Sequence, residues 1–245
     1  MDGGIEIMRK VIVSGGGSGM GRAVTEDFVK RGDSVLILGR RADRLEKVAE
    51  ELGPTVEFKS CDLTNPDDVA RSLEGCSSFD VLVNCAGGKS HTTGTDLNSV
   101  HKRWLEDFST NVLTAVLLTE AVLPLLTKGN PRLITVSSIA ALRGNDSYGA
   151  AKAALHGWNH SMVARMAELG GTANIVVPGY TYGTEFFGGG EPSKAELSRR
   201  AAESPLGRFG EIDDVVGAIA YLSSAQAGFV TGQFLGVNGG AVLGR

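Results

Sequence analysis

A tyrosine and a lysine four positions apart are the residue pair best suited to chemistry in this sequence. Tyr148 and Lys152 stand within a stretch of helical pattern, and residues spaced i and i+4 share one face of a helix. A phenol, with a reference pKa of about 10, is a poor proton donor or acceptor at neutral pH, but a nearby cation favours the phenolate. The spacing therefore predicts a phenol that exchanges a proton with a bound substrate.

A glycine-rich turn near the start of the chain is suited to binding phosphate. It follows a short apolar run and leads into a helical pattern. Glycines permit a tight turn and let backbone N–H groups approach a pyrophosphate at a helix N-terminus, where the helix dipole adds attraction. The residues expected to make this contact are Gly15, Gly17, Ser18, Gly19, Met20 and Gly21.

These residues are positioned by apolar runs that alternate with helical patterns. Strands are predicted at 10–14, 34–38, 55–59, 79–83, 132–136, 173–177 and 233–237. Helices are predicted at 19–31, 42–52, 66–73, 98–126, 147–169 and 211–223. The strands are apolar throughout, which indicates burial on both faces and hence a parallel sheet covered by helices. We therefore predict a single doubly wound α/β domain over residues 9–245, after a short polar leader at 1–8.

The end of the second predicted strand bears on the choice of cofactor. In the usual dinucleotide-binding fold an acidic residue near this point holds the ribose 2′-hydroxyl. Here the strand ends in Leu38-Gly39-Arg40-Arg41, with no carboxylate, and a guanidinium can instead hold a 2′-phosphate bidentately. The sequence predicts that Arg40 and Arg41 contact the cofactor and that NADP(H) is preferred, with NAD(H) as the alternative.

A long stretch after the sixth predicted strand has no strand of its own. It contains two phenylalanines followed by three glycines, Gly188 to Gly190. A glycine-hinged insertion of this kind is more often a binding lid than a linker, so we predict a substrate lid at about 184–204.

The composition argues against several classes of function. The chain has 24 Lys and Arg against 28 Asp and Glu, a net charge of −4, with no basic run longer than a pair, which disfavours nucleic-acid binding. Three cysteines without ligand spacing indicate reduced thiols in a cytoplasmic protein. No signal peptide or membrane span is expected. His156 and His160 share a helix face, but no third ligand accompanies them, so no metal site is expected.

The ordered set of motifs resembles the classical short-chain dehydrogenase/reductase (SDR) family. In chain order the motifs are Gly15-xxx-Gly19-x-Gly21, Asn84-Cys85-Ala86-Gly87, Asn111, Ser138, Tyr148-xxx-Lys152 and Pro178-Gly179. The match covers residues 9 to 245. The resemblance implies a Rossmann domain with a seven-stranded parallel sheet and helices on both faces, a nicotinamide cofactor, and a homotetramer or homodimer.

The resemblance also implies a role for each member of a catalytic tetrad. Tyr148 would exchange the proton with the substrate oxygen, and Lys152 would lower the pKa of Tyr148 and hold the nicotinamide ribose. Ser138 would hydrogen-bond the carbonyl, and Asn111 would hold a water that connects Lys152 to solvent. Only ten positions separate Ser138 from Tyr148, whereas about 13 are common in the family. We therefore expect a trimmed loop at 139–147, with Ser137 as the alternative donor.

Further cofactor contacts follow from the same resemblance. Asp62 and Leu63 would lie against the adenine, and the nicotinamide would approach Pro178 and Gly179. The carboxamide contact would come from Thr181 or from Thr184. Residues expected along the ribose side are Asn84, Ala86 and Gly87, with Cys85 as a small buried neighbour.

The leading hypothesis is an NADP(H)-dependent oxidoreductase that transfers hydride between nicotinamide and a carbonyl or secondary alcohol, running as a ketone reductase. The alternative is a sensor or scaffold that binds the cofactor with little or no catalysis, which the intact Ser138, Tyr148 and Lys152 disfavour. A dehalogenase-like lyase on this fold lacks the phosphate-binding glycines and replaces the lysine with arginine, and neither holds here.

The expected partners are a small carbonyl or alcohol substrate and further copies of the chain. The two long helices carry small and apolar residues suited to contact between copies, Trp158, Met162 and Met166 among them. Residues proposed as walls of the substrate pocket are Ser90, His91, Arg143, Asn145, Tyr180, Tyr182, Phe186 and Phe187.

Overall fold

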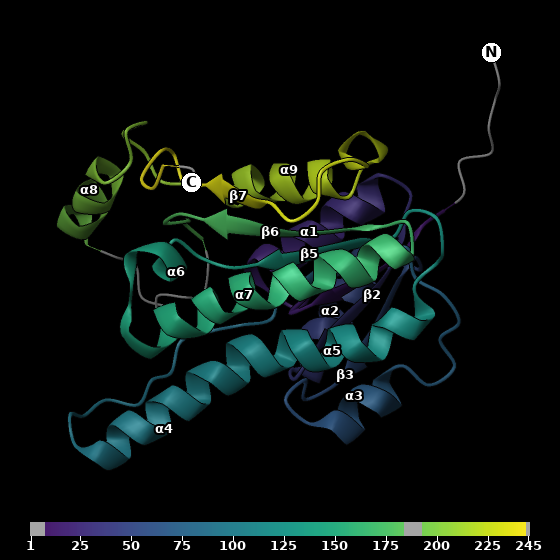
Figure 1. The fold of residues 1–245 in the computed structure, drawn as a ribbon, viewed down its shortest axis with the longest axis horizontal. Coiled ribbons are helices and arrows are strands. Elements are labelled where there is room, and N and C mark those ends of the chain that lie inside the picture. The colour runs from purple at the N-terminus through teal and green to yellow at the C-terminus, as the bar shows by residue number, and fades with distance from the viewer. Residues whose placement is uncertain (1–7, 184–192, 244–245) are drawn as a thin grey trace.

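A parallel sheet of seven strands forms the centre of the computed structural model, which describes residues 8–183 and 193–243 (Figure 1). The strand order is β3-β2-β1-β4-β5-β6-β7, and every neighbouring pair is parallel. This confirms the predicted doubly wound sheet. The strands are β1 (Lys10–Ser14), β2 (Ser34–Gly39), β3 (Val56–Ser60), β4 (Val81–Asn84), β5 (Arg132–Val136), β6 (Thr172–Pro178) and β7 (Phe234–Val237).

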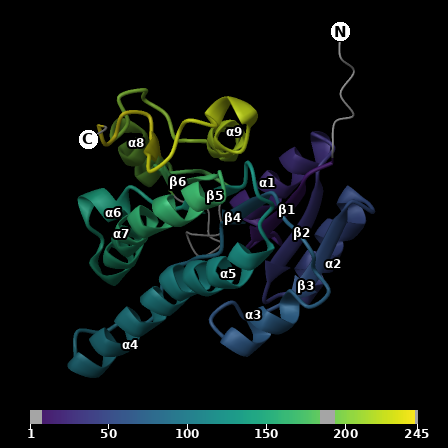
Figure 2. The same ribbon diagram turned by 45° about the vertical axis from the view of Figure 1, so that its right-hand side comes forward.

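Helices cover both faces of the sheet, as Figure 2 shows. They are α1 (Gly19–Lys30), α2 (Ala42–Leu52), α3 (Pro66–Ser72), α4 (Leu97–Phe108), α5 (Thr114–Val122), α6 (Ala140–Arg143), α7 (Asp146–Glu168), α8 (Lys194–Ala202) and α9 (Ile212–Leu222). Alternate residues of β1 feed two separate cores. Val11 and Val13 pack in one core with side chains of α1, α2 and α9, whereas Ile12 packs in the other with α3, α5 and α7. The continuous apolar strands are therefore explained by burial on both faces.

The carboxyl ends of the strands meet at one edge of the sheet. Ser14 pairs in register with both Leu38 and Asn84, and Val136 pairs with Val176. Chain connections run to opposite sides of β1, because β2 lies on one side of it and β4 on the other. Ligands of open α/β sheets bind at such a switch point, outside the carboxyl ends of the strands.

The predicted helix at 98–126 is interrupted. Asp96 caps α4 by accepting hydrogen bonds from the N–H groups of Asn98 and Ser99, and α4 then runs into a π-helical turn at Ser109–Leu113. After this turn come α5 and a short 3₁₀ turn at Leu123–Leu125. The whole unit, Leu97–Leu125, is long and apolar enough to cross a membrane, a test that core helices of folded domains also pass, and 39% of its apolar window is buried.

Two helices were not expected from the sequence. The single turn α6 lies in the loop predicted to be trimmed, and α8 lies within the predicted lid, where Ser193 caps it by accepting a hydrogen bond from the N–H of Glu196. The segment 184–192 of that lid lies outside the described residues. Both views place α6 and α8 at the same end of the molecule (Figures 1 and 2).

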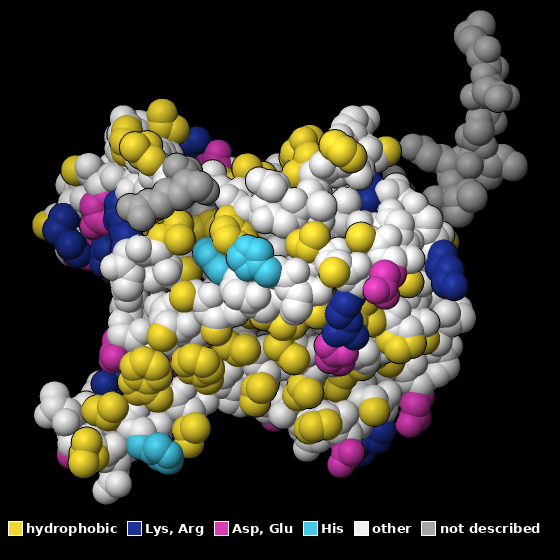
Figure 3. Space-filling view, in the orientation of Figure 1, with side chains coloured by type: hydrophobic (Ala, Val, Ile, Leu, Met, Phe, Trp, Pro, Cys, Tyr) yellow, Lys and Arg dark blue, Asp and Glu magenta, His cyan; other side chains and the backbone are white. Residues whose placement is uncertain are grey.

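The front helices present a hydrophobic surface. In Figure 3 hydrophobic side chains gather over α4, α5 and α7. Trp104, Leu105 and Leu113 are 38%, 58% and 44% exposed, respectively. In contrast, Met162 and Met166 of α7, which we expected to be available for contact between copies, point into the core and are buried there. Any helix contact between copies must therefore use other residues.

Alanine substitutions at two glycines are expected to change the stability of the protein in opposite directions. A Cβ at Gly21 would lie 2.2 Å from the carbonyl oxygen of Gly15, whereas a Cβ at Gly157, inside α7, would meet nothing within 4 Å. We expect Gly21→Ala to lower the free energy of unfolding by about 1–3 kcal/mol because the turn must open. Gly157→Ala should raise it by about 0.5–1 kcal/mol because glycine weakens a helix interior. Chemical denaturation measures the free energy of unfolding of both variants, and the same change in both would contradict this prediction.

Candidate active site

Tyr148 and Lys152 lie on the inner face of α7, where each is only 5% exposed. The Lys152 Nζ atom lies 6.0 Å from the centre of the Tyr148 ring and donates a hydrogen bond of 3.0 Å to the carbonyl of Val136, the last residue of β5. The predicted helix face thus brings the two side chains together beside the carboxyl ends of the strands.

Burial dominates the acid–base properties of this pair. It raises the pKa of Tyr148 to about 12, an effect that a hydrogen bond with Ser138 partly offsets, and it lowers the pKa of Lys152 to about 8. Lys152 was expected to lower the pKa of Tyr148, but burial is the largest influence and the net shift is upward. At neutral pH the phenol is protonated and available as a proton donor.

The two adjacent serines have different surroundings. Ser137 is buried, and its hydroxyl lies 2.8 Å from His156 Nε2 and 3.3 Å from the backbone oxygen of Lys152. The Ser138 hydroxyl accepts a hydrogen bond of 3.1 Å from the N–H of Ala140 and also forms a hydrogen bond with the side chain of Tyr148. Burial is the main factor that lowers the pKa of His156, so its ring is neutral at pH 7.

Asn111 lies in the π-helical turn and is buried. Its side-chain amide exchanges two hydrogen bonds with the backbone of Gly88, accepting from the N–H at 3.1 Å and donating to the carbonyl at 2.7 Å, and it also donates to the backbone carbonyl of Asp107. A Cβ at Gly87 would lie 2.8 Å from Asn111 Oδ1 and 3.1 Å from Lys152 Nζ. Asn111 therefore holds the loop after β4 close to Lys152.

The glycine turn forms a cradle that side chains would fill. Gly15 has a φ of +73°, and a Cβ there would lie 3.1 Å from the backbone of Ala86, while Gly19 has a φ of +51°. The turn leads into α1, whose first turn has no acidic residue and starts with Ser18 as its N-cap and Met20 as its second residue. Open backbone, a helix N-terminus and no repelling carboxylate fit a pyrophosphate, which is the fit that a dinucleotide requires.

Ser14 was missed by the sequence interpretation although it begins the glycine turn. Its hydroxyl accepts hydrogen bonds of 3.0 Å from the N–H groups of both Cys85 and Ala86, so it ties the end of β1 to the loop after β4. Asn84 turns into the core instead, where its amide donates to Thr119 and Thr135. Cys85 is half-buried beside Lys152, and desolvation of its thiol raises its pKa to about 12.

Of the residues expected around the adenosine end, the two arginines lie on the surface and Leu63 does not. Arg40 and Arg41 are exposed, and an Arg41 Nη atom donates to the Ser18 hydroxyl at 2.9 Å, which brings the end of β2 to the glycine turn. Asp62 accepts from the N–H and the hydroxyl of Thr64, and these bonds lower its pKa. Leu63 is a core residue.

The segment after β6 approaches the same edge. A Cβ at Gly179 would lie 2.8 Å from Asn238, so this glycine allows the chain to pass close to the end of β7. Thr181 is buried, and its hydroxyl donates to the carbonyl of Gly179 at 3.2 Å. Thr184, the alternative to Thr181, lies outside the described residues.

A cavity of about 230 Å³ brings these elements together. Its described lining comprises Met20, Ser137, Ser138, Ile139, Ala140, Arg143, Gly144, Asn145, Tyr148, Pro178, Gly179, Tyr180, Thr181, Arg200 and Glu203. Arg143, Asn145 and Tyr180 were predicted as walls, whereas Arg200 and Glu203 were missed because α8 was not recognised as a helix. The available signal was the helical spacing of the charges: Arg200 lies four positions after Glu196 and three before Glu203, and it forms an ion pair with each.

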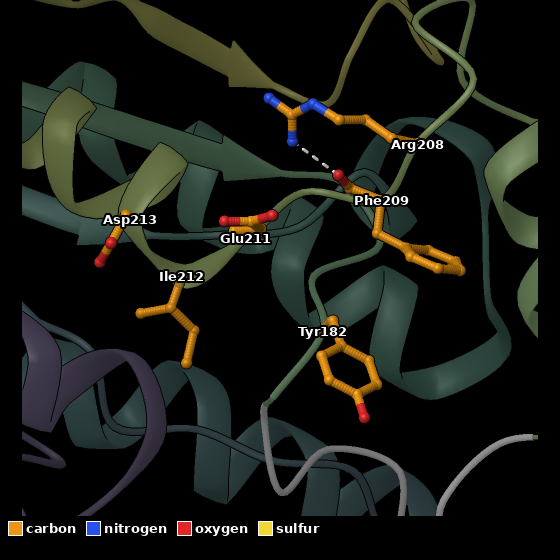
Figure 4. Close-up of a pocket in the computed structure, with 6 residues that line it drawn as sticks. All are labelled: Tyr182, Arg208, Phe209, Glu211, Ile212 and Asp213. Carbon is orange, nitrogen blue, oxygen red and sulfur yellow. Dashed lines mark hydrogen bonds between the residues drawn. The ribbon is translucent and has the colours of Figure 1, made fainter.

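Other predicted walls lie elsewhere. The Ser90 hydroxyl donates to Glu106 on α4, and His91 is exposed. Phe186 and Phe187 lie outside the described residues. Tyr182 lines a second, more open pocket of about 400 Å³ with Phe209, where an Arg208 Nη atom donates to the carbonyl of Phe209 (Figure 4).

The histidine pair on α7 contacts an aromatic ring. The centres of the His156 and His160 rings lie 4.4 Å and 5.5 Å from that of Phe234 on β7. Across residues 8–183 and 193–243, no three His, Cys, Asp or Glu side chains are grouped so that they could hold a metal ion. Cys61, Cys76 and Cys85 are free thiols.

Comparisons with known proteins place these features in a family. A family model described as enoyl-(acyl carrier protein) reductase matches residues 15–242. Two relatives that carry the name 3-oxoacyl-(acyl-carrier-protein) reductase are similar over nearly their whole length. The protein from Vibrio cholerae is 31% identical over 244 residues, and the protein from Salmonella typhimurium is 30% identical over 242; each alignment covers 95% of this chain and 96% of the relative.

Solved structures agree. An SDR described as a glucose/ribitol dehydrogenase from Brucella melitensis superposes with a TM-score of 0.85 at 26% identity, covering 96% of this chain and 97% of that one. Aldohexose dehydrogenase from Thermoplasma acidophilum, in ligand-free form, has a TM-score of 0.81 at 27% identity, covering 96% and 94%. Together with the motifs and the parallel sheet, these matches show that the chain belongs to the classical short-chain dehydrogenase/reductase family and is an NAD(P)-dependent oxidoreductase.

Proposed function

We propose that this oxidoreductase uses NADPH to reduce a small ketone to a secondary alcohol. The observation that carries the proposal is the position of Tyr148, which lines a cavity together with Ser138 and lies next to the buried Lys152. The bound dinucleotide supplies the hydride. The proton that completes the alcohol must come from the protein, and Tyr148, which carries its proton at neutral pH and lines the cavity with Ser138, is positioned to give it.

The remaining residues position the substrate and replace the proton. Ser138 donates a hydrogen bond to the carbonyl oxygen and polarises it. Tyr148 gives its proton to the same oxygen as negative charge develops there, and Lys152, whose pKa of about 8 lies near neutrality, stabilises the tyrosinate that remains. Asn111, which holds the loop after β4 through Gly88, would bind a water that connects Lys152 to solvent and so replaces the proton.

The glycine cradle and the second strand would hold the dinucleotide. Gly15, Gly19 and Gly21 leave the backbone open for the pyrophosphate, Arg40 and Arg41 bind the 2′-phosphate, and Lys152 contacts the nicotinamide ribose. The free thiols fit a reducing compartment, so we place the enzyme in the cytoplasm, and we propose that it acts as a homo-oligomer.

Removal of the proton donor provides the first test. Tyr148→Phe keeps the ring packing but removes the exchangeable proton, so turnover with NADPH and a reducible ketone should fall by at least about 10²-fold. NADPH affinity, measured by fluorescence titration, should stay within a few-fold. Tyr221→Phe, the same change at a half-exposed position of α9, is the control. Near-normal turnover in Tyr148→Phe would end the assignment.

The two serines can be compared directly. Because Ser138 hydrogen-bonds Tyr148 at the cavity, Ser138→Ala should lower kcat by about 10²-fold or more, as expected when a donor to the developing oxyanion is lost. Ser137→Ala should lower the melting temperature, since it leaves His156 without its partner, and should affect kcat less. The reverse order of the kcat effects would assign the catalytic hydroxyl to Ser137.

Cofactor preference tests the charge at the end of β2. Charge-assisted hydrogen bonds to the 2′-phosphate contribute on the order of 1.5–3 kcal/mol, or about tenfold to a hundredfold in Kd. NADPH should therefore bind more tightly than NADH, and Arg40→Asp should shift the preference toward NADH. Arg165→Asp makes the same charge change on an exposed part of α7 and serves as control. Equal Kd values for NADH and NADPH in the wild-type protein at low salt would contradict the assignment.

A further inference from the structure

The cavity that Tyr148 and Ser138 line also has charged residues in its wall. Among its described lining residues, those charged at neutral pH are Arg143, Arg200 and Glu203, which leaves an excess of one positive charge. The other lining side chains are apolar or neutral. Two guanidinium groups in the wall would add nothing to the binding of an uncharged ketone, but they would attract an anionic substrate.

The two arginines converge on one carboxylate. Arg143 Nη1 lies 2.9 Å from Glu203 Oε2, and Arg200 Nη1 lies 3.3 Å from Glu203 Oε1. Arg143, at the end of α6, also donates to the carbonyl of Ala241, and Arg200, on α8, also pairs with Glu196. Each guanidinium carries five N–H donors, so both retain capacity for a further oxygen acceptor.

The position of Arg200 is further fixed by an aromatic ring. Its guanidinium carbon lies 4.9 Å from the centre of the Tyr180 ring, which itself lines the cavity. Such stacking holds the planar group in one orientation and suits bidentate recognition of a carboxylate. The pairs with Glu203 are partly open to solvent, since the side chains of Arg143, Arg200 and Glu203 are 37%, 33% and 30% exposed. A ligand carboxylate can therefore join or displace Glu203 at little cost.

Building on the proposed reductase function, we propose that the substrate is an oxo acid, whose carboxylate binds Arg143 and Arg200 while its ketone oxygen binds Ser138 and Tyr148. The cavity of about 230 Å³ is smaller than the 300–1,000 Å³ common for ligand sites, which favours a compact acid. Arg143 and Arg200 determine specificity, and Glu203 holds them in place when no substrate is bound.

Kinetics with matched substrates tests this assignment. NADPH-dependent reduction is measured for pyruvate, acetoacetate and levulinate and for the methyl ester of each, which keeps the ketone but removes the charge. For at least one pair, kcat/KM should be about 10- to 100-fold higher for the acid than for the ester, as charge-assisted hydrogen bonds allow. Raised salt should reduce this ratio.

Three variants locate the preference. Arg143→Gln and Arg200→Gln should each lower the acid-to-ester ratio toward one, chiefly through KM for the acid, while reduction of the ester shows that the variants fold. Arg199→Gln is the matched control, because Arg199 is the neighbour of Arg200, pairs with the same two glutamates and does not line the cavity. It should keep the wild-type ratio.

The outcomes separate the two proposals. Esters reduced as efficiently as their acids, or a ratio that Arg143→Gln and Arg200→Gln leave unchanged, would overturn the oxo-acid assignment and leave the reductase function standing. A ratio lowered equally by Arg199→Gln would also overturn it, because the effect would then be one of general charge. Reduction of neither acids nor esters would remove the reductase proposal and this one with it.

Discussion

A buried ammonium group sets the geometry of the site. Lys152 is almost without contact with solvent, and an unpaired charge in such a place would cost several kcal/mol. The protein offsets this cost in two ways, through the hydrogen bond to the carbonyl of Val136 and through a pKa lowered to about 8. The end of β5, the face of α7 and the side-chain-free Gly87 are all required for that arrangement. Tyr148 then follows from helix geometry, because it lies one turn before Lys152.

A second polar contact holds α7 from the other side. Ser137 joins the end of β5 to His156 and to the backbone of Lys152, so both serines after β5 act on the same helix, but at different depths. The Ser137 hydroxyl hydrogen-bonds within the core, whereas the Ser138 hydroxyl lies beside Tyr148 at the cavity. Adjacent residues at the end of a strand point to opposite sides, which is why one position separates a packing role from an exposed one.

The elements with strong local signals could be predicted from the sequence. These signals are the continuous apolar strands, the glycine turn and the Tyr148–Lys152 spacing. Each depends on residues close together in the sequence, so the sheet and the Tyr148–Lys152 pair could be located from the sequence. The wall made by Arg200 and Glu203 could not be predicted in the same way. It depends on the end of α8 meeting α6 through the Arg143–Glu203 ion pair, a long-range contact that the short polar helix does not encode in its own pattern. The burial that raises the Tyr148 pKa is likewise a property of the assembled layers.

The π-helical turn at Ser109–Leu113 has a consequence for the length of its segment. A regular α-helix advances by about 100° per residue, whereas a π turn takes one extra residue into the turn and leaves the helix after it in nearly the same orientation. The extra residue lets Asn111 face Gly88 while Leu118 and Val122 still face the sheet core. A deletion of a single residue that restored a regular α-helix would therefore keep the buried side of α5 on the sheet, but it would remove the turn that presents Asn111 to Gly88. Loss of one residue here would thus alter the site while sparing the core, and an alignment gap at 109–113 would mark a relative whose loop after the fourth strand is held in another way.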